Sequence, residues 1–253
     1  MCELFGITAD SKIHINEYLT VFFGHSVEHR HGWGTALLDD NAVAVEKEPV
    51  RAVDSKYLKN RLTGDIWTSR FMAHIRKATI GDVSFNNTHP FVKADFSGNK
   101  WVLVHNGTIF ESPELSKYQY IQEGSTDSER ILLYIVDRFN GLGPDANDSD
   151  RFKLIDEIVH ILTPGNKVNF LLYDGSYFYI HKNEPGTLYR KEKDGAVFFS
   201  THPLCDSGWE EVDKNTLLVY RDGKLEYKGT RHENTYHHDE SKMRLIYMDH
   251  AML

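Results

Sequence analysis

The second residue of the chain carries the most reactive group. Cys2 directly follows Met1. If Met1 is removed, Cys2 becomes the N-terminal residue and carries a thiol and a free α-amine. A thiolate is a strong nucleophile, and an α-amine with a reference pKa of about 7.7–8.0 can act as a base near neutral pH. One residue could thus supply nucleophile and base together. Taken alone, a cysteine without function is the simpler interpretation, so the case depends on the rest of the chain.

A second candidate element is the sequence His105-Asn106-Gly107, which directly follows an apolar run at residues 101–104. An asparagine amide and a glycine backbone N–H are both hydrogen-bond donors, and glycine permits close backbone approach. Together the two donors could stabilise an oxyanion. An ordinary Asn-Gly turn is the alternative, and it is favoured if this segment is considered alone.

Two side chains of opposite charge could recognise a small ligand. Arg76 ends an expected strand, where period-2 alternation puts His74 on the same face. A guanidinium group suits bidentate capture of a carboxylate. Asp127 lies in the first turn of an expected helix, where the helix dipole stabilises a carboxylate, and it could bind an ammonium group. The alternatives are a surface salt bridge for Arg76 and a simple capping role for Asp127.

Aromatic and histidine side chains offer further candidates. In Gly32-Trp33-Gly34, a large aromatic flanked by glycines could form the wall of a pocket, or Trp33 could be a core residue. The chain has 14 histidines, of which His29/His31 and His237/His238 are closest in sequence. Neither pair has the Cys, His or carboxylate companions of a zinc site. The sequence therefore predicts no metal site, and the chemistry above requires no cofactor.

The elements that must position these residues follow from hydrophobic periodicity and turn residues. Strands are expected over 3–8, 35–38, 42–45, 70–76, 101–104, 168–173, 177–181, 196–200, 217–221 and 225–227. Helices are expected over 16–23 and 55–62, from Thr126 to a stop at Gly141, and over 151–162. Thr126 and Glu129 have the spacing of a capping box. Strands at both ends with two adjacent helices between them favour packed sheets plus helices over an alternating βαβ array.

Composition limits the broad class of protein. The chain has 253 residues and a formal net charge of −8, which argues against non-specific nucleic-acid binding. No run approaches the roughly 18 apolar residues of a membrane helix, and no signal peptide is recognisable. The two cysteines suggest no disulfide framework and fit a reducing cytoplasm. We find no domain boundary, so a single domain over 1–253 is expected, with a polar, His-rich, surface-packed tail over 229–253.

Taken together, the ordered motifs resemble the class II glutamine amidotransferase family, within the N-terminal nucleophile hydrolases. No motif is specific alone, but their order and spacing agree over residues 2–129, and the similarity is greatest to compact stand-alone members of the YafJ-like type. Residues 200–204 resemble a later family segment. The motifs are Met-Cys-Glu-Leu-Phe-Gly at the start, Gly32-Trp33-Gly34, Ala73-His74-Ile75-Arg76-Lys77-Ala78-Thr79, Thr88-His89-Pro90-Phe91, His105-Asn106-Gly107 and Thr126-Asp127-Ser128-Glu129.

The resemblance implies an α+β fold, a four-layer αββα sandwich of two antiparallel sheets covered by helices. It implies glutamine as substrate, Cys2 as nucleophile and a γ-glutamyl thioester that water hydrolyses to glutamate. It also implies that Asn106 and Gly107 hold the oxyanion, while Arg76 binds the α-carboxylate and Asp127 the α-ammonium of the substrate. Trp33 and His74 complete the candidate substrate-binding residues.

Two departures from the family pattern bear on function. Relatives often carry an acidic residue before Gly-Trp-Gly, whereas this chain has His31. Larger relatives use the ammonia in an attached synthase domain, for which 253 residues leave no room, so an ammonia-accepting synthase would be a separate partner. Two other functions remain open. One is hydrolysis of a γ-glutamyl peptide or conjugate, and the other is a non-catalytic binding module on the same scaffold.

Overall fold

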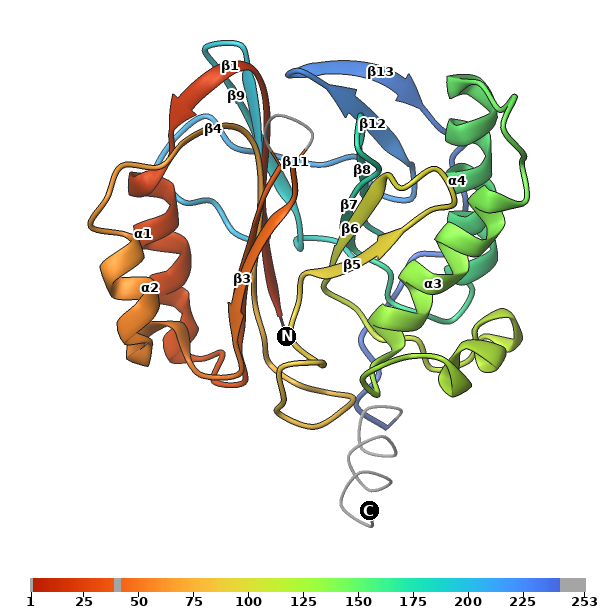
Figure 1. Ribbon diagram of the computed structural model, residues 1–253, viewed down its shortest axis with the longest axis horizontal. Helices are drawn as coiled ribbons and strands as arrows, with labels where there is room; N and C mark the ends of the chain where they lie inside the picture. The colour runs from red at the N-terminus through yellow and green to blue at the C-terminus, as the bar shows by residue number, and fades with distance from the viewer. Residues whose placement is uncertain (1, 39–41, 242–253) are drawn as a thin grey trace.

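Two antiparallel β-sheets packed face to face form the centre of the molecule, and helices cover both outer faces (Figure 1). The computed structural model describes residues 2–38 and 42–241. This arrangement is the αββα sandwich of the α+β class that the family resemblance implies. Residues 39–41, between the expected strands over 35–38 and 42–45, and the last part of the expected tail lie outside the described residues.

The first sheet has seven strands in the order β11-β9-β10-β1-β4-β2-β3. Its centre is β1, which pairs antiparallel with β4 so that Glu3 faces Ile75. The N-terminal start of β1 therefore lies beside the C-terminal end of β4. The strands are β1 (Glu3–His14), β2 (Trp33–Leu37), β3 (Ala44–Glu48), β4 (Trp67–Ile75), β9 (Tyr189–Lys193), β10 (Ala196–Ser200) and β11 (Glu210–Glu211).

The second sheet has six strands in the order β13-β12-β8-β7-β6-β5. Strand β6 pairs antiparallel with β7, and its last residue, His105, faces Phe170. The chain that leaves β6 carries the Asn106-Gly107 segment. The strands are β5 (Phe91–Ala94), β6 (Lys100–His105), β7 (Phe170–Tyr173), β8 (Phe178–His181), β12 (Leu218–Arg221) and β13 (Lys224–Lys228).

Helices α1 and α2 lie on the outer face of the first sheet, and α3 and α4 lie on the outer face of the second (Figure 1). None of the helices in the described part of the chain has the length and apolar character needed to cross a membrane. The helices are α1 (Asn16–Gly24), α2 (Lys56–Arg61), α3 (Asp127–Asn140) and α4 (Asp148–Leu162), with 3-10 turns η1 (His25–Val27), η2 (Ala52–Asp54) and η3 (Pro113–Tyr120).

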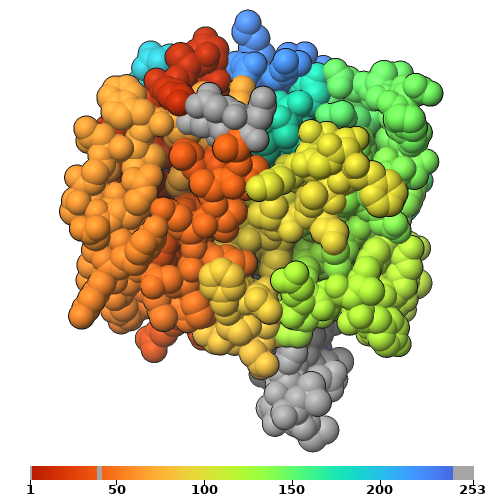
Figure 2. Space-filling view, in the orientation of Figure 1, coloured from red at the N-terminus to blue at the C-terminus, as the bar shows by residue number. Residues whose placement is uncertain are grey.

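The core is divided by these layers. Buried side chains from both sheets, such as Leu4, Met72, Val104 and Leu171, form the cluster between the sheets. Separate clusters fill the space under α1 and α2 and under α3 and α4. In the space-filling view, side chains of the two halves meet along this face of the molecule (Figure 2). The ends of β1, β4 and β6 are thus held at fixed positions relative to one another.

Helix capping differs in part from expectation. Thr126 caps α3, because its hydroxyl accepts the Glu129 N–H at 3.3 Å. Glu129 does not complete a capping box, since its carboxylate accepts the N–H groups of Glu123 and Gly124 at 2.7 and 2.8 Å. A complete capping box at Asn147 instead opens α4, which begins three residues before the expected start of that helix.

Candidate active site

A pocket lies where β1 begins and where β4 and β6 end. It brings together segments that are far apart in the sequence, because β1 pairs with β4 in the first sheet and a hydrogen bond from His74 to His105 O joins the end of β4 to the end of β6. Its walls include the thiol of Cys2 and the amide of Asn106. The lining residues are Cys2, Lys77, Thr79, Asn106, Gly107, Thr108, Lys167, Tyr236 and His238.

Cys2 directly precedes β1, the central strand of the first sheet. Its half-buried sulfur contacts the backbone N–H and the carbonyl oxygen of Lys77, each at 3.4 Å. The adjoining start of β1 is fixed by Thr201, whose hydroxyl accepts the Leu4 N–H at 2.8 Å. Burial raises the pKa of the Cys2 thiol, and the Lys77 N–H and the charges of Arg76 and Lys167 oppose that rise. Deprotonation at neutral pH therefore needs a base.

The side-chain amide of Asn106 is a buried donor whose Nδ2 has no hydrogen-bond partner among the residues that the structure describes. Its backbone is fixed, because the Asn106 N–H donates to Asn169 O at 2.8 Å. Buried polar atoms without partners are uncommon in folded proteins, because each one loses its hydrogen bonds to water. An unpaired amide in the same pocket as a thiol is therefore suited to an oxygen supplied by a ligand.

The segment that carries Asn106 and Gly107 is clamped at its C-terminal side. Thr108 and Lys167 exchange backbone hydrogen bonds at 3.0 and 3.1 Å, and the Ile109 N–H donates to Asp127 Oδ2 at 2.7 Å. A Cβ atom at Gly107 would collide with the carbonyl oxygen of Lys167 and the ring of His105. Glycine is thus required there by close packing, and the donor segment is rigid before any ligand arrives.

Asp127 stands at the start of α3, where its buried carboxylate supports that segment. Besides the bond from Ile109, its Oδ1 accepts the Ser128 N–H at 2.9 Å. An ionised carboxylate has about four acceptor sites, so these bonds leave capacity for a further donor. Asp127 does not itself appear among the residues that line the described pocket.

Arg76 supports the loop that follows β4. Its guanidinium donates to the carbonyl oxygens of Ile80, Gly81 and Asp82 at 2.8–3.0 Å. Burial lowers the pKa of Arg76, and the negative charges of Cys2, Asp127 and Asp82 oppose that shift. Cys2 and Asp127 therefore both lie within electrostatic range of Arg76, although Arg76 lies outside the pocket lining.

His74 and Trp33 are core residues in the structure. The His74 ring is fully buried, and its Nε2 donates to the His105 carbonyl at 3.2 Å, directly before Asn106. Burial lowers the pKa of His74 to about 3, so the ring is neutral. Trp33 packs in the cluster beneath α1 and α2, and its indole N–H donates to Glu48 at 3.1 Å. Of the two interpretations of Trp33, pocket wall or core residue, the structure supports the core residue.

The sequence did not indicate a role for His31, and in the structure this residue makes hydrogen bonds to the loop after β4. Its Nδ1 accepts the Ala78 N–H at 2.8 Å, and its backbone N–H donates to Arg76 O at 3.0 Å. Both bonds fix the first residues of the loop after β4, beside Cys2. Burial lowers the pKa of His31, as do the nearby charges of Arg76, Lys77 and Arg30.

Several lining residues were not among the sequence candidates. Thr79 belongs to a motif already noted, and Thr108 directly follows Gly107, so both could have been included by adjacency. Lys167 reaches the pocket through its pairing with Thr108, which no local pattern reveals. Tyr236 and His238 come from the expected tail, whose path along the molecule is set by tertiary contacts.

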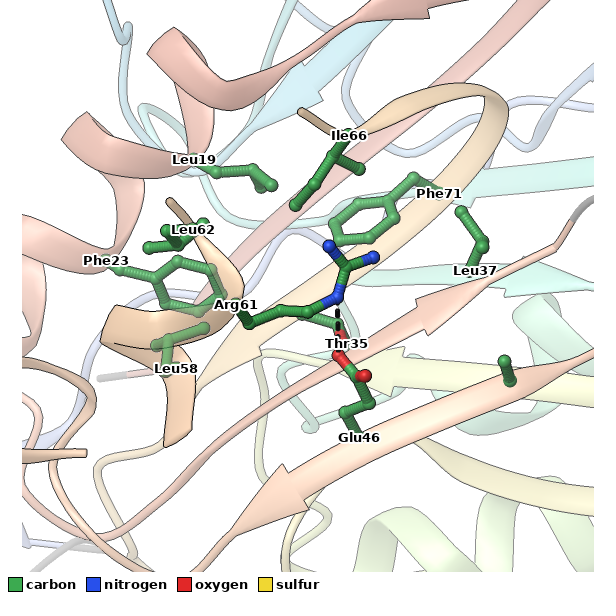
Figure 3. Close-up of a pocket in the computed structure, with 11 residues that line it drawn as sticks. Leu19, Phe23, Thr35, Leu37, Glu46, Leu58, Arg61, Leu62, Ile66 and Phe71 are labelled. Carbon is green, nitrogen blue, oxygen red and sulfur yellow. Dashed lines mark ion pairs between the residues drawn. The ribbon is translucent and has the colours of Figure 1, made fainter. Parts of the chain in front are cut away.

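A second cleft lies between the first sheet and helices α1 and α2 (Figure 3). Its walls are mainly aliphatic and aromatic, with an ion pair between Arg61 and Glu46 at 3.5 Å. No cysteine or histidine is among its described lining residues. This cleft therefore offers neither a thiol nor an imidazole for catalysis.

Known proteins resemble this chain in sequence and in fold. The family model for class II glutamine amidotransferases matches residues 1–193. YafJ of Escherichia coli, which carries the provisional name of a glutamine amidotransferase, is 29% identical to this chain. The match covers 70% of this chain and 71% of YafJ. The gamma-glutamyl-hercynylcysteine sulfoxide hydrolase of Mycolicibacterium smegmatis is 23% identical over 79% of this chain and 82% of its own. The fold matches that of the glutamine phosphoribosylpyrophosphate amidotransferase from B. subtilis with a TM-score of 0.69 and 16% identity, over 92% of this chain and 50% of that chain.

Proposed function

Because the chain belongs to the class II glutamine amidotransferase family, we propose that it hydrolyses the side-chain amide of glutamine with Cys2 as nucleophile. The observation that carries this proposal is the buried Asn106 Nδ2, which has no partner among the described residues and lines the same pocket as the Cys2 thiol. A simple structural asparagine would use that donor internally. An oxyanion hole needs it free.

In the first half of the reaction, the α-amine of Cys2, exposed by removal of Met1, accepts the thiol proton through a water molecule. The sulfur then forms a bond to the amide carbon of glutamine. Negative charge moves onto the amide oxygen, where the Asn106 side chain and the Gly107 N–H donate hydrogen bonds to it. Because these donors are already fixed, they stabilise the tetrahedral intermediate without rearrangement.

In the second half, the protonated α-amine returns a proton to the amide nitrogen, and the carbon–nitrogen bond breaks to release ammonia. The γ-glutamyl thioester that remains on Cys2 is attacked by water, activated by the same amine. Glutamate leaves and the thiol is restored. The ammonia goes either to solvent or to a separate synthase partner.

Arg76 and Asp127 are proposed to bind opposite ends of the substrate zwitterion. A guanidinium has five N–H donors, and the three bonds to backbone carbonyls leave others for the α-carboxylate. The carboxylate of Asp127 keeps acceptor capacity for the α-ammonium. The backbone bonds of both side chains hold them in one orientation, which lowers the entropic cost of binding.

The proposal is tested by measuring glutamate and ammonia release from glutamine by protein whose Met1 has been removed. Wild type should turn over, and Cys2→Ala should not. Retention of normal turnover by Cys2→Ala would overturn the assignment. Cys205→Ala is the matched control, because Cys205 is an exposed cysteine outside the pocket.

A second candidate is hydrolysis of a γ-glutamyl conjugate, in which a larger amine replaces ammonia as the leaving group. The name of the M. smegmatis relative favours it, since that protein is a hydrolase of a gamma-glutamyl compound. The same Cys2, Asn106 and Gly107 would act on the same carbonyl. A panel of glutamine, γ-glutamyl dipeptides and γ-glutamyl amines separates the two by their kcat/KM values.

A further inference from the structure

The active-site pocket is completed by a part of the chain that the family model does not match. That model ends at residue 193, whereas Tyr236 and His238 line the pocket together with Cys2. The segment formed by residues 229–239 therefore adds its own wall to a site whose remaining lining residues fall within the matched part.

This segment is attached firmly along its length. Gly229 donates its N–H to Leu217 O at 2.8 Å, and Thr230 donates to the Asp156 carboxylate at 2.7 and 3.0 Å. Further along, the His232 N–H donates to Asn215 O at 3.0 Å. These contacts join the segment to α4 and to the end of the second sheet, so its path to the pocket is fixed.

Tyr236 itself is rigidly placed. Its N–H donates to Asn183 O at 2.8 Å, and the Asn183 amide donates in turn to Asn234 O at 3.0 Å. Its ring stacks on Phe110 with centroids 6.0 Å apart and planes at 14°. Only 7% of Tyr236 is exposed. A ring held by backbone and stacking contacts cannot easily swing away to admit a bulky group.

The position of this wall relates it to the leaving group. If Arg76 and Asp127 hold the α-carbon end of the substrate, that end lies on their side of Cys2, and neither residue belongs to the pocket lining. The amide nitrogen, at the other end of the glutamine side chain, is then assigned to the side of Cys2 that Tyr236 and His238 line. An N-substituent would project from that nitrogen toward Tyr236.

We propose that Tyr236 limits the size of the leaving group, so that the enzyme prefers the unsubstituted amide of glutamine to N-substituted γ-glutamyl compounds. This inference rests on the proposed function and decides between its two candidate substrates. The ring acts as a steric specificity determinant, with no part in bond making or breaking.

The test compares kcat/KM for glutamine, γ-glutamyl methylamide and γ-glutamylglycine. In wild type, the value should fall as the substituent grows. Tyr236→Ala should raise the ratio of γ-glutamylglycine to glutamine at least tenfold, whereas Tyr236→Phe, which keeps the ring, should retain the wild-type preference. Tyr120→Ala is the matched control, because Tyr120 is 80% exposed and lies outside the pocket.

Three outcomes can be told apart. Absence of Cys2-dependent turnover on every substrate in wild type would overturn the proposed function itself. Turnover with a wild-type preference for γ-glutamylglycine, or a ratio that Tyr236→Ala leaves unchanged, would overturn only the steric role of Tyr236. If thermal melting shows Tyr236→Ala to be unfolded, Tyr236→Leu replaces it, and the same rise in ratio is required.

Discussion

Asn106 offers the sharpest test at the scale of single residues. Asn106→Ala should lower kcat by about 10²–10³, the typical cost of one lost oxyanion donor. Folding stability should hardly change, because the Nδ2 atom has no partner among the described residues to lose. Steady-state kinetics and thermal melting measure the two effects.

The matched control is Asn166→Ala, which removes the same side chain from a place where it is used. The Asn166 amide bonds to the carbonyls of Glu111 and Leu162 at 2.8 and 2.9 Å, so this variant should lose stability. If Asn106→Ala instead melts like Asn166→Ala, or keeps normal kcat, Asn106 is a structural residue.

Variants of Arg76 and Asp127 test how the substrate is bound. Arg76→Ala and Asp127→Asn should each lower kcat/KM for glutamine at least tenfold, because a charged hydrogen bond contributes about 1.5–3 kcal/mol. Arg76→Lys should not restore activity, since a single ammonium cannot replace the planar fork that holds three loop carbonyls.

A glutamine analogue without its α-amine distinguishes two roles of Asp127. One is binding of the substrate ammonium, and the other is support of the protein backbone. The analogue should be poor with wild type, and the further penalty should largely vanish in Asp127→Asn. If the loss of kcat/KM caused by removing the α-amine and the loss caused by Asp127→Asn add independently, Asp127 only holds Ile109 and the start of α3.

Residue types and spacing predicted only part of the site. Cys2, Asn106 and Gly107 were anticipated and share one pocket, because each has a property that is local to the sequence: a terminal position or a donor directly after a strand. The indole N–H of Trp33 and the Nε2 of His74 each make a hydrogen bond in the core, which depends on neighbours distant in sequence. Tyr236 could not be found at all, since nothing in its local sequence indicates the pocket.

At the scale of elements, α3 matters because its first residue, Asp127, supports the donor segment. Thr126→Ala removes the hydroxyl that caps this helix and should lower stability by about 0.5–2 kcal/mol. It should also reduce kcat/KM, because fraying of the first turn displaces Asp127. Chemical denaturation and kinetics measure these effects.

Asn147→Ala is the comparison, since it removes the cap of α4, where no pocket residue lies. A similar loss of stability with unchanged kcat/KM is expected there. Equal kinetic effects of the two variants would show that general destabilisation, and not the position of Asp127, explains the loss of activity.

Most elements were predictable from periodicity, and the exceptions have a common cause. Strands β5, β9 and β11 were missed because they lie at or next to a sheet edge, where most of their residues are partly or fully exposed. Glu129 fitted a capping box in sequence, yet it bonds to Glu123 and Gly124, whose proximity only the folded loop creates. Local patterns identify buried elements more readily than edges.

At the scale of the whole molecule, buried histidines predict acid sensitivity. Burial lowers the pKa of His74 and His181 to about 3 and that of His232 to about 4. In the unfolded chain their pKa is about 6.5. Below pH 6.5 the unfolded state therefore binds more protons than the folded state. As the pH is lowered, the free energy of unfolding decreases by up to about 1.4 kcal/mol per pH unit for each such histidine.

Urea unfolding between pH 7.5 and about 5 checks this slope, above the range in which ordinary carboxylates titrate. His181→Phe should flatten it, and His237→Phe, at an exposed position, should not. Above pH 6.5 the stability should be nearly constant. A slope that His181→Phe leaves unchanged would contradict the buried neutral state of this ring.

The sandwich as a whole was anticipated from the resemblance, and local periodicity alone would not have given its strand order. The order β10-β1-β4-β2 depends on tertiary packing, because β10 begins at Ala196 whereas its neighbour β1 ends at His14. The same long-range assembly brings the C-terminal segment to Cys2. Local sequence carries the chemistry, and the global packing decides which residues surround it.

The central claim is that an N-terminal Cys2 forms a γ-glutamyl thioester. The most direct measurement is intact-protein mass spectrometry of acid-quenched reactions with glutamine, on protein with and without Met1. We predict an adduct of one γ-glutamyl group on Cys2 in protein that lacks Met1, and none in Cys2→Ala or in protein that retains Met1. The mechanism would be contradicted if the Cys2→Ala variant, which forms no adduct, still hydrolysed glutamine. Full activity in protein that retains Met1 would also contradict it.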